Sequence, residues 1–212
     1  MRTVVVERLV RRKAWIEVEL HAVKGGGKQL RVASEAREAG TWQASSITEG
    51  TDGVVYLPTV TPIDENGDVV HEGDFVSQYR YVLEKAGAML EAVGLGLGHA
   101  VTTYDYSTPE TRSVYRGTHK VRKELLGNNP GNVYPGAGGI LMSQLHAPGA
   151  LVAIDVTASR HPLEIVNPGW SRYDTLTYAP GIKAGRMLFM SGFAALDMES
   201  QQALYDGDLG KQ

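Results

Sequence analysis

The spacing of apolar residues along this chain switches between a helical repeat and short strand-like runs, and the clearest helix follows Asp74. From Val76 to Val93 the apolar positions recur at three and four, which gives the segment one apolar and one polar face. Gly94 and Gly96 end the pattern. A second helix is predicted from Thr108, read as a capping residue before a proline, to about residue 126.

Strands are predicted where β-branched and aromatic residues gather between glycine-rich turns. The N-terminal runs 3–7 and 14–23 read as a hairpin, and the stretch from Gln29 to Val60 reads as two or three strands. A single strand follows the first helix at 99–106. The runs 138–145 and 150–158 read as a second hairpin, and 160–170 reads as a linker. Hairpins at the ends and alternating helices predict an α+β fold, a mixed sheet with both helices on one face.

The strongest pattern in the chain is an internal repeat. Residues 56–78 recur about 133 positions later as 189–212, and residues 9–19 recur about 136 positions later as 145–155. Repetition at domain scale predicts repeated structural units. We expect the C-terminal hairpin of one module at 1–28, a complete module at 29–160, and a linker with the N-terminal strands of a further module at 161–212.

Charge and composition narrow the classes of partner. The chain has 212 residues, a net charge of -3 and no cysteine, so it offers no basic field for a nucleic acid and no thiolate metal site. No apolar run reaches the length of a membrane span, and the N-terminus lacks a signal-peptide pattern. The six histidines show no spacing typical of a metal site. These patterns predict a cytoplasmic protein without nucleic acid, membrane or metal.

The motifs in the repeats resemble the Rid family, also called YjgF or endoribonuclease L-PSP. Its members carry a strand ending in Ser-Gly, then Asp…Gly and a Gly-Asp…Gln that opens a helix, and they close with a Val-Glu-Ile-Glu strand. This chain has Ser191-Gly192, then Asp197, then Gly207-Asp208 and Gln212. Tyr178 lies thirteen residues before Ser191, the family's spacing, and the N-terminal run 16–19 reads Ile-Glu-Val-Glu.

The resemblance implies a chorismate-mutase-like module that assembles as a trimer, with ligand clefts between neighbouring modules. It also implies hydrolysis of an enamine or imine to a ketone and ammonia without metal or cofactor. An arginine would bind the substrate carboxylate, a task that suits the fork of a guanidinium.

Carried over residue by residue, the resemblance assigns Glu17, Tyr178 and Ser191 as catalytic. Gly192, Arg2 and Tyr115 become substrate-binding candidates, with Tyr115 at the position of a common family asparagine on the second helix. The complete module departs from the family pattern, because its Ser-Gly-Gln is Pro-Thr-Val at 58–60 and its tyrosine position holds serine. Its arginine and glutamate positions are both alanine, at 137 and 153.

Three functions therefore stay open. The leading one is a Rid-type deaminase or related hydrolase of a small 2-imino acid type substrate. The second is a catalytically degenerate Rid-like scaffold or ligand-binding protein, which the two alanines favour. The third is a divergent hydrolase of a cyclic or aromatic molecule. Because residues typical of the family lie in the outer segments, we expect a homotrimer, an internal pseudo-trimer or a companion chain to complete the split module.

Overall fold

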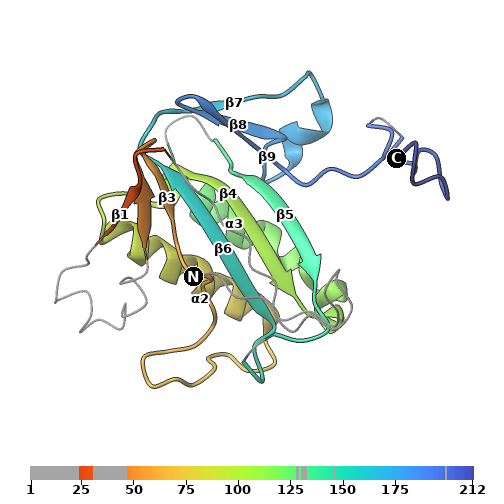
Figure 1. The fold of residues 1–212 in the computed structure, drawn as a ribbon. Coiled ribbons are helices and arrows are strands. Elements are labelled where there is room, and N and C mark those ends of the chain that lie inside the picture. The colour runs from red at the N-terminus through yellow and green to blue at the C-terminus, as the bar shows by residue number, and fades with distance from the viewer. Residues whose placement is uncertain (1–23, 31–46, 128, 130–132, 146, 199) are drawn as a thin grey trace, which may run out of the picture.

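A computed structural model describes residues 24–30, 47–127, 129, 133–145, 147–198 and 200–212. Its main sheet has six strands in the spatial order β1-β2-β3-β6-β4-β5 (Figure 1). The strands are β1 (Gly27–Gln29), β2 (Thr48–Gly50), β3 (Val54–Tyr56), β4 (Ala100–Ser107), β5 (Gly136–Leu141) and β6 (Val152–Ser159). Neighbours are antiparallel except β4 and β5, which are parallel. The predicted mixed sheet is confirmed.

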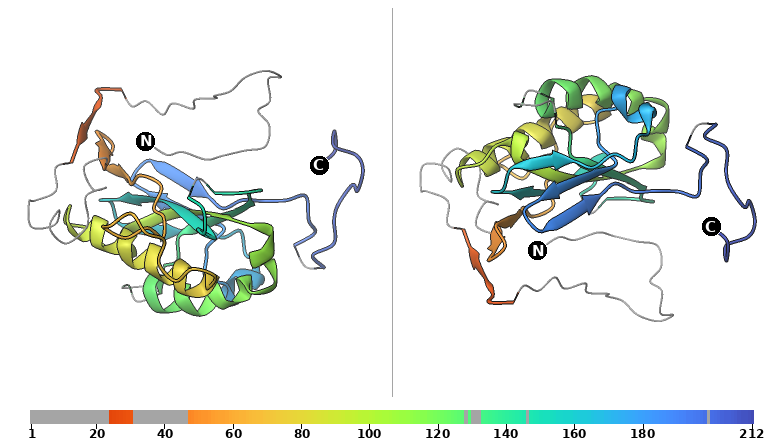
Figure 2. Two further views of the ribbon diagram at one scale, coloured as in Figure 1. Left: turned by 90° about the horizontal axis from the view of Figure 1, so that it is seen from below. Right: turned by 90° about the horizontal axis from the view of Figure 1, so that it is seen from above.

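Two helices, α2 (Phe75–Glu91) and α3 (Thr118–Leu126), cover one face of this sheet (Figure 2). Helix α2 begins as predicted, because the Asp74 carboxylate accepts a hydrogen bond of 3.1 Å from the backbone N–H of Ser77. Its apolar face packs on the sheet, where Tyr79 and Leu83 are fully buried. No helix among the described residues is long and apolar enough to cross a membrane.

The predicted second helix is shorter than expected. Two 3₁₀ turns, η3 (Pro109–Ser113) and η4 (Tyr115–Gly117), precede α3, and a further one, η2 (Leu97–His99), leads into β4. Thr108 makes no capping hydrogen bond, so the predicted cap is wrong. Tight packing explains the turns: a Cβ on Gly117 would lie 2.7 Å from Val76, so the chain at this point runs directly against α2.

The predicted hairpin between β5 and β6 is also wrong. Strand β4 lies between them, pairing with β5 in parallel and with β6 antiparallel. All eight residues of β6 are buried. A run that is buried on both faces fits a central strand, and β6 accordingly sits between β3 and β4.

The C-terminal segment forms a second, three-stranded sheet from β7 (Leu163–Ile165), β8 (Gly181–Ala184) and β9 (Met187–Met190), with the 3₁₀ turn η5 (Ser171–Thr175) between β7 and β8. Ile182 and Ala184 of β8 pack with Val101 of β4 in a small apolar cluster. The segment is therefore joined to the large sheet through β4.

The internal repeat is visible in backbone geometry. His71 and Tyr205 have φ values of 50° and 54°, and Gly73 and Gly207 have 79° and 78°. The same turn follows in both copies of the repeat. The backbone N–H of Gln78 donates to the Asp74 carbonyl at 3.0 Å, and the backbone N–H of Gln212 donates to the Asp208 carbonyl at 3.1 Å. The module boundaries at 28 and 160 stay predictions. The predicted hairpin at 3–23 lies outside the described residues.

Candidate functional site

The C-terminal segment meets the large sheet at β5. The backbone N–H of Gly192 donates to the carbonyl of Ala137 at 2.9 Å, and the N–H of Ala179 donates to the carbonyl of Pro135 at 3.1 Å. The Ser-Gly pair is thereby brought to Ala137, the position where the resemblance places a substrate-binding arginine. The described residues thus contain one junction between a module and the strands that follow it.

The hydroxyl of Ser191 makes two backbone hydrogen bonds at this junction. It donates to the Ala179 carbonyl at 2.5 Å and accepts from the Ala137 N–H at 2.9 Å. Ser191 is also buried. Because its single proton is committed to a backbone carbonyl, Ser191 holds the two segments together and is not poised as a nucleophile.

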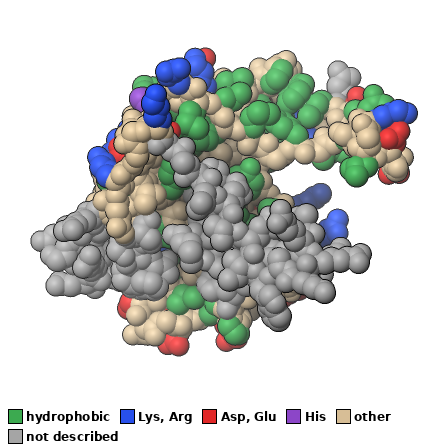
Figure 3. Space-filling view, viewed as in Figure 1, with side chains coloured by type: hydrophobic (Ala, Val, Ile, Leu, Met, Phe, Trp, Pro, Cys, Tyr) green, Lys and Arg blue, Asp and Glu red, His purple; other side chains and the backbone are tan. Residues whose placement is uncertain are grey.

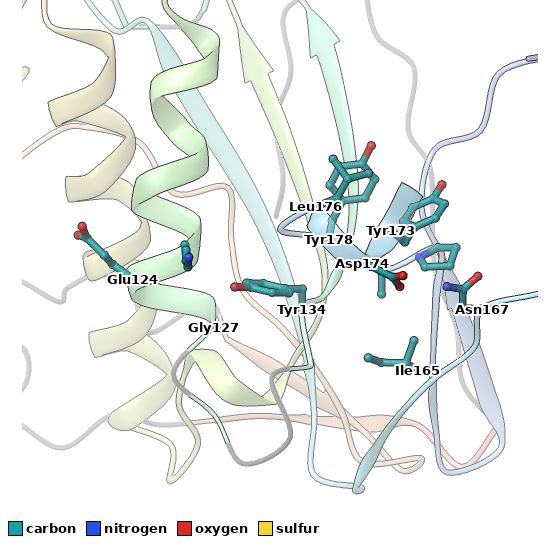
Figure 4. Close-up of a pocket in the computed structure, with 12 residues that line it drawn as sticks. Glu124, Gly127, Tyr134, Ile165, Asn167, Tyr173, Asp174, Leu176 and Tyr178 are labelled. Atoms are coloured by element: carbon teal, nitrogen blue, oxygen red, sulfur yellow. The ribbon is translucent and has the colours of Figure 1, made fainter. Parts of the chain in front are cut away.

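Tyr178 lies at the same junction, on the segment between η5 and β8. Its ring meets the ring of Tyr173 edge-on, with centroids 5.6 Å apart. In Figure 4 its hydroxyl points away from Tyr134 and Asp174. The structure therefore brings the segment with Tyr178, Ser191 and Gly192 to β5. On the same strand a Cβ at Gly139 would lie 3.4 Å from the Tyr115 hydroxyl.

Tyr115 is held by a buried polar network between β4, α2 and α3. Its hydroxyl donates to Oδ2 of Asp105 at 2.9 Å, and the hydroxyl of Tyr79 donates to the same oxygen at 2.8 Å. Arg122 donates from Nη1 to the Tyr79 oxygen at 2.9 Å and from Nε to the Thr177 carbonyl at 3.2 Å. The network thus reaches from the helices to the C-terminal segment.

Burial sets the electrostatics of this network. It raises the pKa of the Asp105 carboxyl, although the nearby Arg122 charge and the two tyrosine hydroxyls act in the opposite direction. It also raises the pKa of Tyr115 well above its ordinary value of 10.0, with further contributions from Asp105. Tyr115 is therefore a neutral phenol throughout the physiological range and handles protons only as a hydrogen-bonding group.

The glycine run of β5 makes room for two of the surrounding tyrosine rings. A Cβ on Gly138 would lie 2.4 Å from the Tyr104 ring, and one on Gly139 would lie 3.4 Å from the Tyr115 hydroxyl. These close approaches explain why side chains are missing from this part of the strand. They also leave the Tyr115 oxygen directly beside an exposed stretch of β5.

A recess of about 700 Å³ opens beside the junction, between the end of α3 and the segment around η5 (Figure 4). Its walls include the aromatic rings of Tyr134, Tyr173 and Tyr178 and the charged side chains of Lys123 and Asp174. The recess is the larger of the two cavities that the described residues outline most clearly.

A curated relative supports the resemblance. Over 43 residues the chain is 46% identical to the 3-aminoacrylate deaminase RutC of Acinetobacter baylyi, a match that spans 20% of this chain and 34% of that protein. The chain therefore resembles the Rid family. The match spans about a third of the relative's length, and no family model matches the chain.

Solved Rid-family structures are similar in fold. A Rid protein, YyfA of Yersinia pestis, is 26% identical, with a TM-score of 0.46 over 53% of this chain and 84% of that one. A YjgF-family protein of Mycobacterium tuberculosis is 22% identical, with a TM-score of 0.45 over 63% of this chain and 99% of that one.

The first copy of the Ser-Gly-Gln motif, at residues 58–60, has threonine in place of the glycine. Thr59, which occupies the glycine position of the complete module's Ser-Gly-Gln, donates to Oδ1 of Asp155 at 2.7 Å, and the Tyr106 hydroxyl donates to Oδ2 at 3.0 Å. Asp155 alternates with Ile154 and so lies on the same side of β6 as Ala153. The helix-free face of the complete module therefore carries a hydrogen-bonded acid two residues beyond the position of the family glutamate.

Two of the assigned Rid residues, Glu17 and Arg2, lie outside the described residues. Sequence reasoning missed Asp105, Arg122 and Tyr79, which hold Tyr115 in place. A signal was present in Asp105, an acid in the middle of a predicted strand, because a charge there needs buried partners. No group of three or more His, Asp or Glu that could hold a metal occurs in the part of the chain that the structure describes.

Proposed function

We propose that this chain forms part of a Rid-type deaminase that hydrolyses a small enamine or imine, of the 2-imino acid type, in a cleft between modules. The observation that supports the proposal most is the junction, where the N–H of Gly192 donates to the Ala137 carbonyl and the Ser191 hydroxyl bonds to Ala137 and Ala179. The deaminase named RutC among the relatives points to the same class of reaction.

The reaction adds water to the C=N carbon of the imine tautomer, and the resulting carbinolamine, which carries one hydroxyl and one amino group on that carbon, loses ammonia to leave a ketone. Tyr115 and Tyr178 would act as hydrogen-bonding groups around the substrate, and Glu17 would orient the water and move its proton. The substrate carboxylate needs a cation, for which the sequence offers Arg2 near the family position. Ser191 and Gly192 would shape the wall of the cleft, since the serine hydroxyl already has two backbone partners.

This function requires neighbouring modules. We propose a homotrimer, an internal pseudo-trimer or a companion chain, in the cytoplasm, with a small molecule as the only substrate. Glu17 belongs to the N-terminal segment and Tyr178 to the C-terminal segment, so a complete cleft unites segments that are far apart in the sequence.

The direct test is deaminase activity. The 212-residue protein is incubated with 2-aminoacrylate generated in situ, and pyruvate and ammonia are followed against buffer; 3-aminoacrylate is assayed in parallel. Faster release than in buffer is expected for at least one substrate. Absence of acceleration with both, from correctly folded protein, would exclude simple enamines and imines as substrates.

Two variants separate site residues from the scaffold. Glu17→Gln is expected to lower kcat by about 10²–10⁴-fold, the usual contribution of a positioned acid or base. Tyr178→Phe keeps the ring and removes only the hydroxyl, so a smaller loss is expected. Lys28→Gln, which alters an exposed lysine in the small strand β1, is the control. Equal activity of Glu17→Gln and the control would remove Glu17 from the site.

A second function, a catalytically degenerate Rid-like scaffold, is favoured by one observation. At the junction the arginine position is Ala137, and the proton of the serine hydroxyl beside it is already donated to the Ala179 carbonyl. A scaffold would bind small carboxylates or other modules without turnover. Calorimetry that detects 2-oxobutyrate binding, combined with no hydrolysis of either enamine, would favour this function over the deaminase.

A further inference from the structure

The internal repeat allows the same strand position to be compared in two surroundings. With an offset of 133, Val55, Leu57 and Val60 of the complete module correspond to Leu188, Met190 and Phe193. The first three are 0–2% exposed and belong to the core cluster that also contains the apolar face of α2. The second three are 51%, 53% and 42% exposed.

The C-terminal sheet therefore has one packed face and one open face. The packed face contains Ile182 and Phe189, which are directly opposite each other on β8 and β9. Both side chains pack in the apolar cluster that includes Val101. The open face carries Leu188 and Met190. Figure 3 shows hydrophobic side chains gathered over this part of the molecule.

Polar groups lie at the margin of this open face. Lys183 is in register with Leu188 and pairs with Glu164 at 3.0 Å. Phe193 extends the apolar side chains of this face and meets the Trp170 ring edge-on, with centroids 5.9 Å apart. An apolar centre with a polar margin is typical of a protein interaction surface.

The loop that follows β9 has the same backbone hydrogen bonds as the loop that leads into α2. Val70 donates to the Pro62 carbonyl at 2.9 Å and Leu204 to the Ala195 carbonyl at 2.8 Å, equivalent bonds of the two loops. The turn that follows has matching positive φ values and the same i→i+4 hydrogen bond that starts α2, now at Asp208–Gln212. The complete module thus shows which element covers this strand face and where its first turn lies.

We propose that the open face, formed by Leu188, Met190 and Phe193, is the docking site of an amphipathic helix, with its first turn beside Asp208. The helix presents aromatic and aliphatic side chains at the spacing found in α2. This inference rests on the modular assembly proposed above. It does not depend on deaminase chemistry, so the two fail in different experiments.

The probe is a peptide with the sequence of residues 74–94, which contains α2. Since the chain lacks cysteine, Leu188→Cys gives a single thiol on the open face, and Ile165→Cys gives a control thiol on the opposite face of the same sheet. At a peptide concentration about four times its dissociation constant, thiol labelling at 188 is expected to slow about fivefold. Labelling at 165 is expected to stay unchanged.

Two controls make the result specific. A peptide with glutamine at the positions of Tyr79, Val82, Leu83 and Leu90 is expected to protect nothing. In a chain with Leu188→Asp and a reporter thiol at Met190→Cys, the α2 peptide is expected to lose its effect, while circular dichroism stays that of the parent. Both substitutions are at half-exposed positions.

Three outcomes would overturn the proposal. They are equal labelling rates with and without the α2 peptide, equal protection by the polar-faced peptide, and self-association through this face. The last is checked by sedimentation of the full chain: a dimer that Leu188→Asp abolishes would mean that a second copy, and not a helix, covers the surface.

Discussion

The complete module and the C-terminal segment carry the same strand, loop and turn, yet they differ in what covers the strand. In the module, Val55 and Leu57 lie beneath α2, whereas Leu188 and Met190 are half-exposed. The loop and turn nevertheless adopt the same backbone geometry in both places. Local structure is therefore set by the repeated residues, and burial is set by whether a partner element is present.

The largest expected difference in the free energy of unfolding is between variants of two arginines, one in the large sheet's polar network and one in the C-terminal segment. Arg122→Met removes a buried cation from the network of Tyr79 and Asp105, and we expect a loss of about 3–5 kcal/mol in the free energy of unfolding. Arg172→Met, in the C-terminal segment, removes a contact over the Tyr173 ring and should cost about 0.5–1 kcal/mol. Urea unfolding measures both. Equal losses would mean that the network is not the stabilising element.

Leucine truncation compares the two apolar surfaces directly. Leu83→Ala, in the core of the complete module, is expected to cost about 2–5 kcal/mol, because it leaves a cavity. Leu188→Ala, on the open face, should change stability by no more than about 0.5 kcal/mol. Thermal and urea unfolding of both variants provide the comparison. A large cost at Leu188 would show that the open face is already covered in solution.

The ion pair of Arg160 with Glu49, in the large sheet, is more buried than that of Lys183 with Glu164, in the C-terminal sheet. We therefore expect the two pairs to contribute differently to stability as the pH changes. The hydrogen bond from Arg160 holds the pKa of Glu49 below its ordinary value of 4.5. Its contribution is therefore present above that value and is lost as the pH falls through the lower, folded-state pKa. Glu49→Gln is expected to cost about 1.5–3 kcal/mol at neutral pH, and this cost should shrink below pH 4.5.

Glu164→Gln is the matched variant in the C-terminal segment. Its partner, Lys183, and Glu164 itself are both more than half exposed, so the cost should be about 0–1 kcal/mol. Unfolding measured at neutral and acid pH distinguishes the two carboxylates. A pH-independent cost at Glu49 would contradict the assignment.

The smallest effect is expected at the two equivalent helix-start residues. Asp74→Ala removes a hydrogen-bonded cap from α2 and should cost about 0.5–2 kcal/mol. Asp208→Ala, at the equivalent turn without a helix behind it, should leave stability unchanged within error. If a docked helix is present, as in the peptide experiment, Asp208→Ala should instead weaken peptide protection.

Parts of this fold could be predicted because they depend on neighbours in the sequence. The start of α2 follows from Asp74 and its apolar repeat, and strand β4 follows from its β-branched and aromatic run. The cap at Thr108 failed because the segment after it forms 3₁₀ turns instead of an α-helix, and near their end Gly117 packs tightly against Val76. Contacts between distant segments overrode the local signal there.

The candidate site divides in the same way. Tyr178, Ser191 and Gly192 were assigned from motifs and their spacing, and the structure brings their segment against β5. Tyr115 was assigned from the position of a family asparagine, and its hydroxyl lies beside the glycines of the same strand. Asp105 and Arg122 were not assigned, because a buried polar network depends on which strand and helix face each other. The roles of Glu17 and Arg2 stay predictions.

By itself, the sequence determined the repeat, the helix-start turns and the mixed α+β character, since these arise from local residue chemistry and periodicity. Only the tertiary structure decided that β6 is central, that the Ser191 hydroxyl joins two segments, and that Leu188 and Met190 are open. The physical reason is that hydrogen-bond partners and burial depend on elements distant in the chain. Equivalent residues can therefore be core in one module and surface in the next.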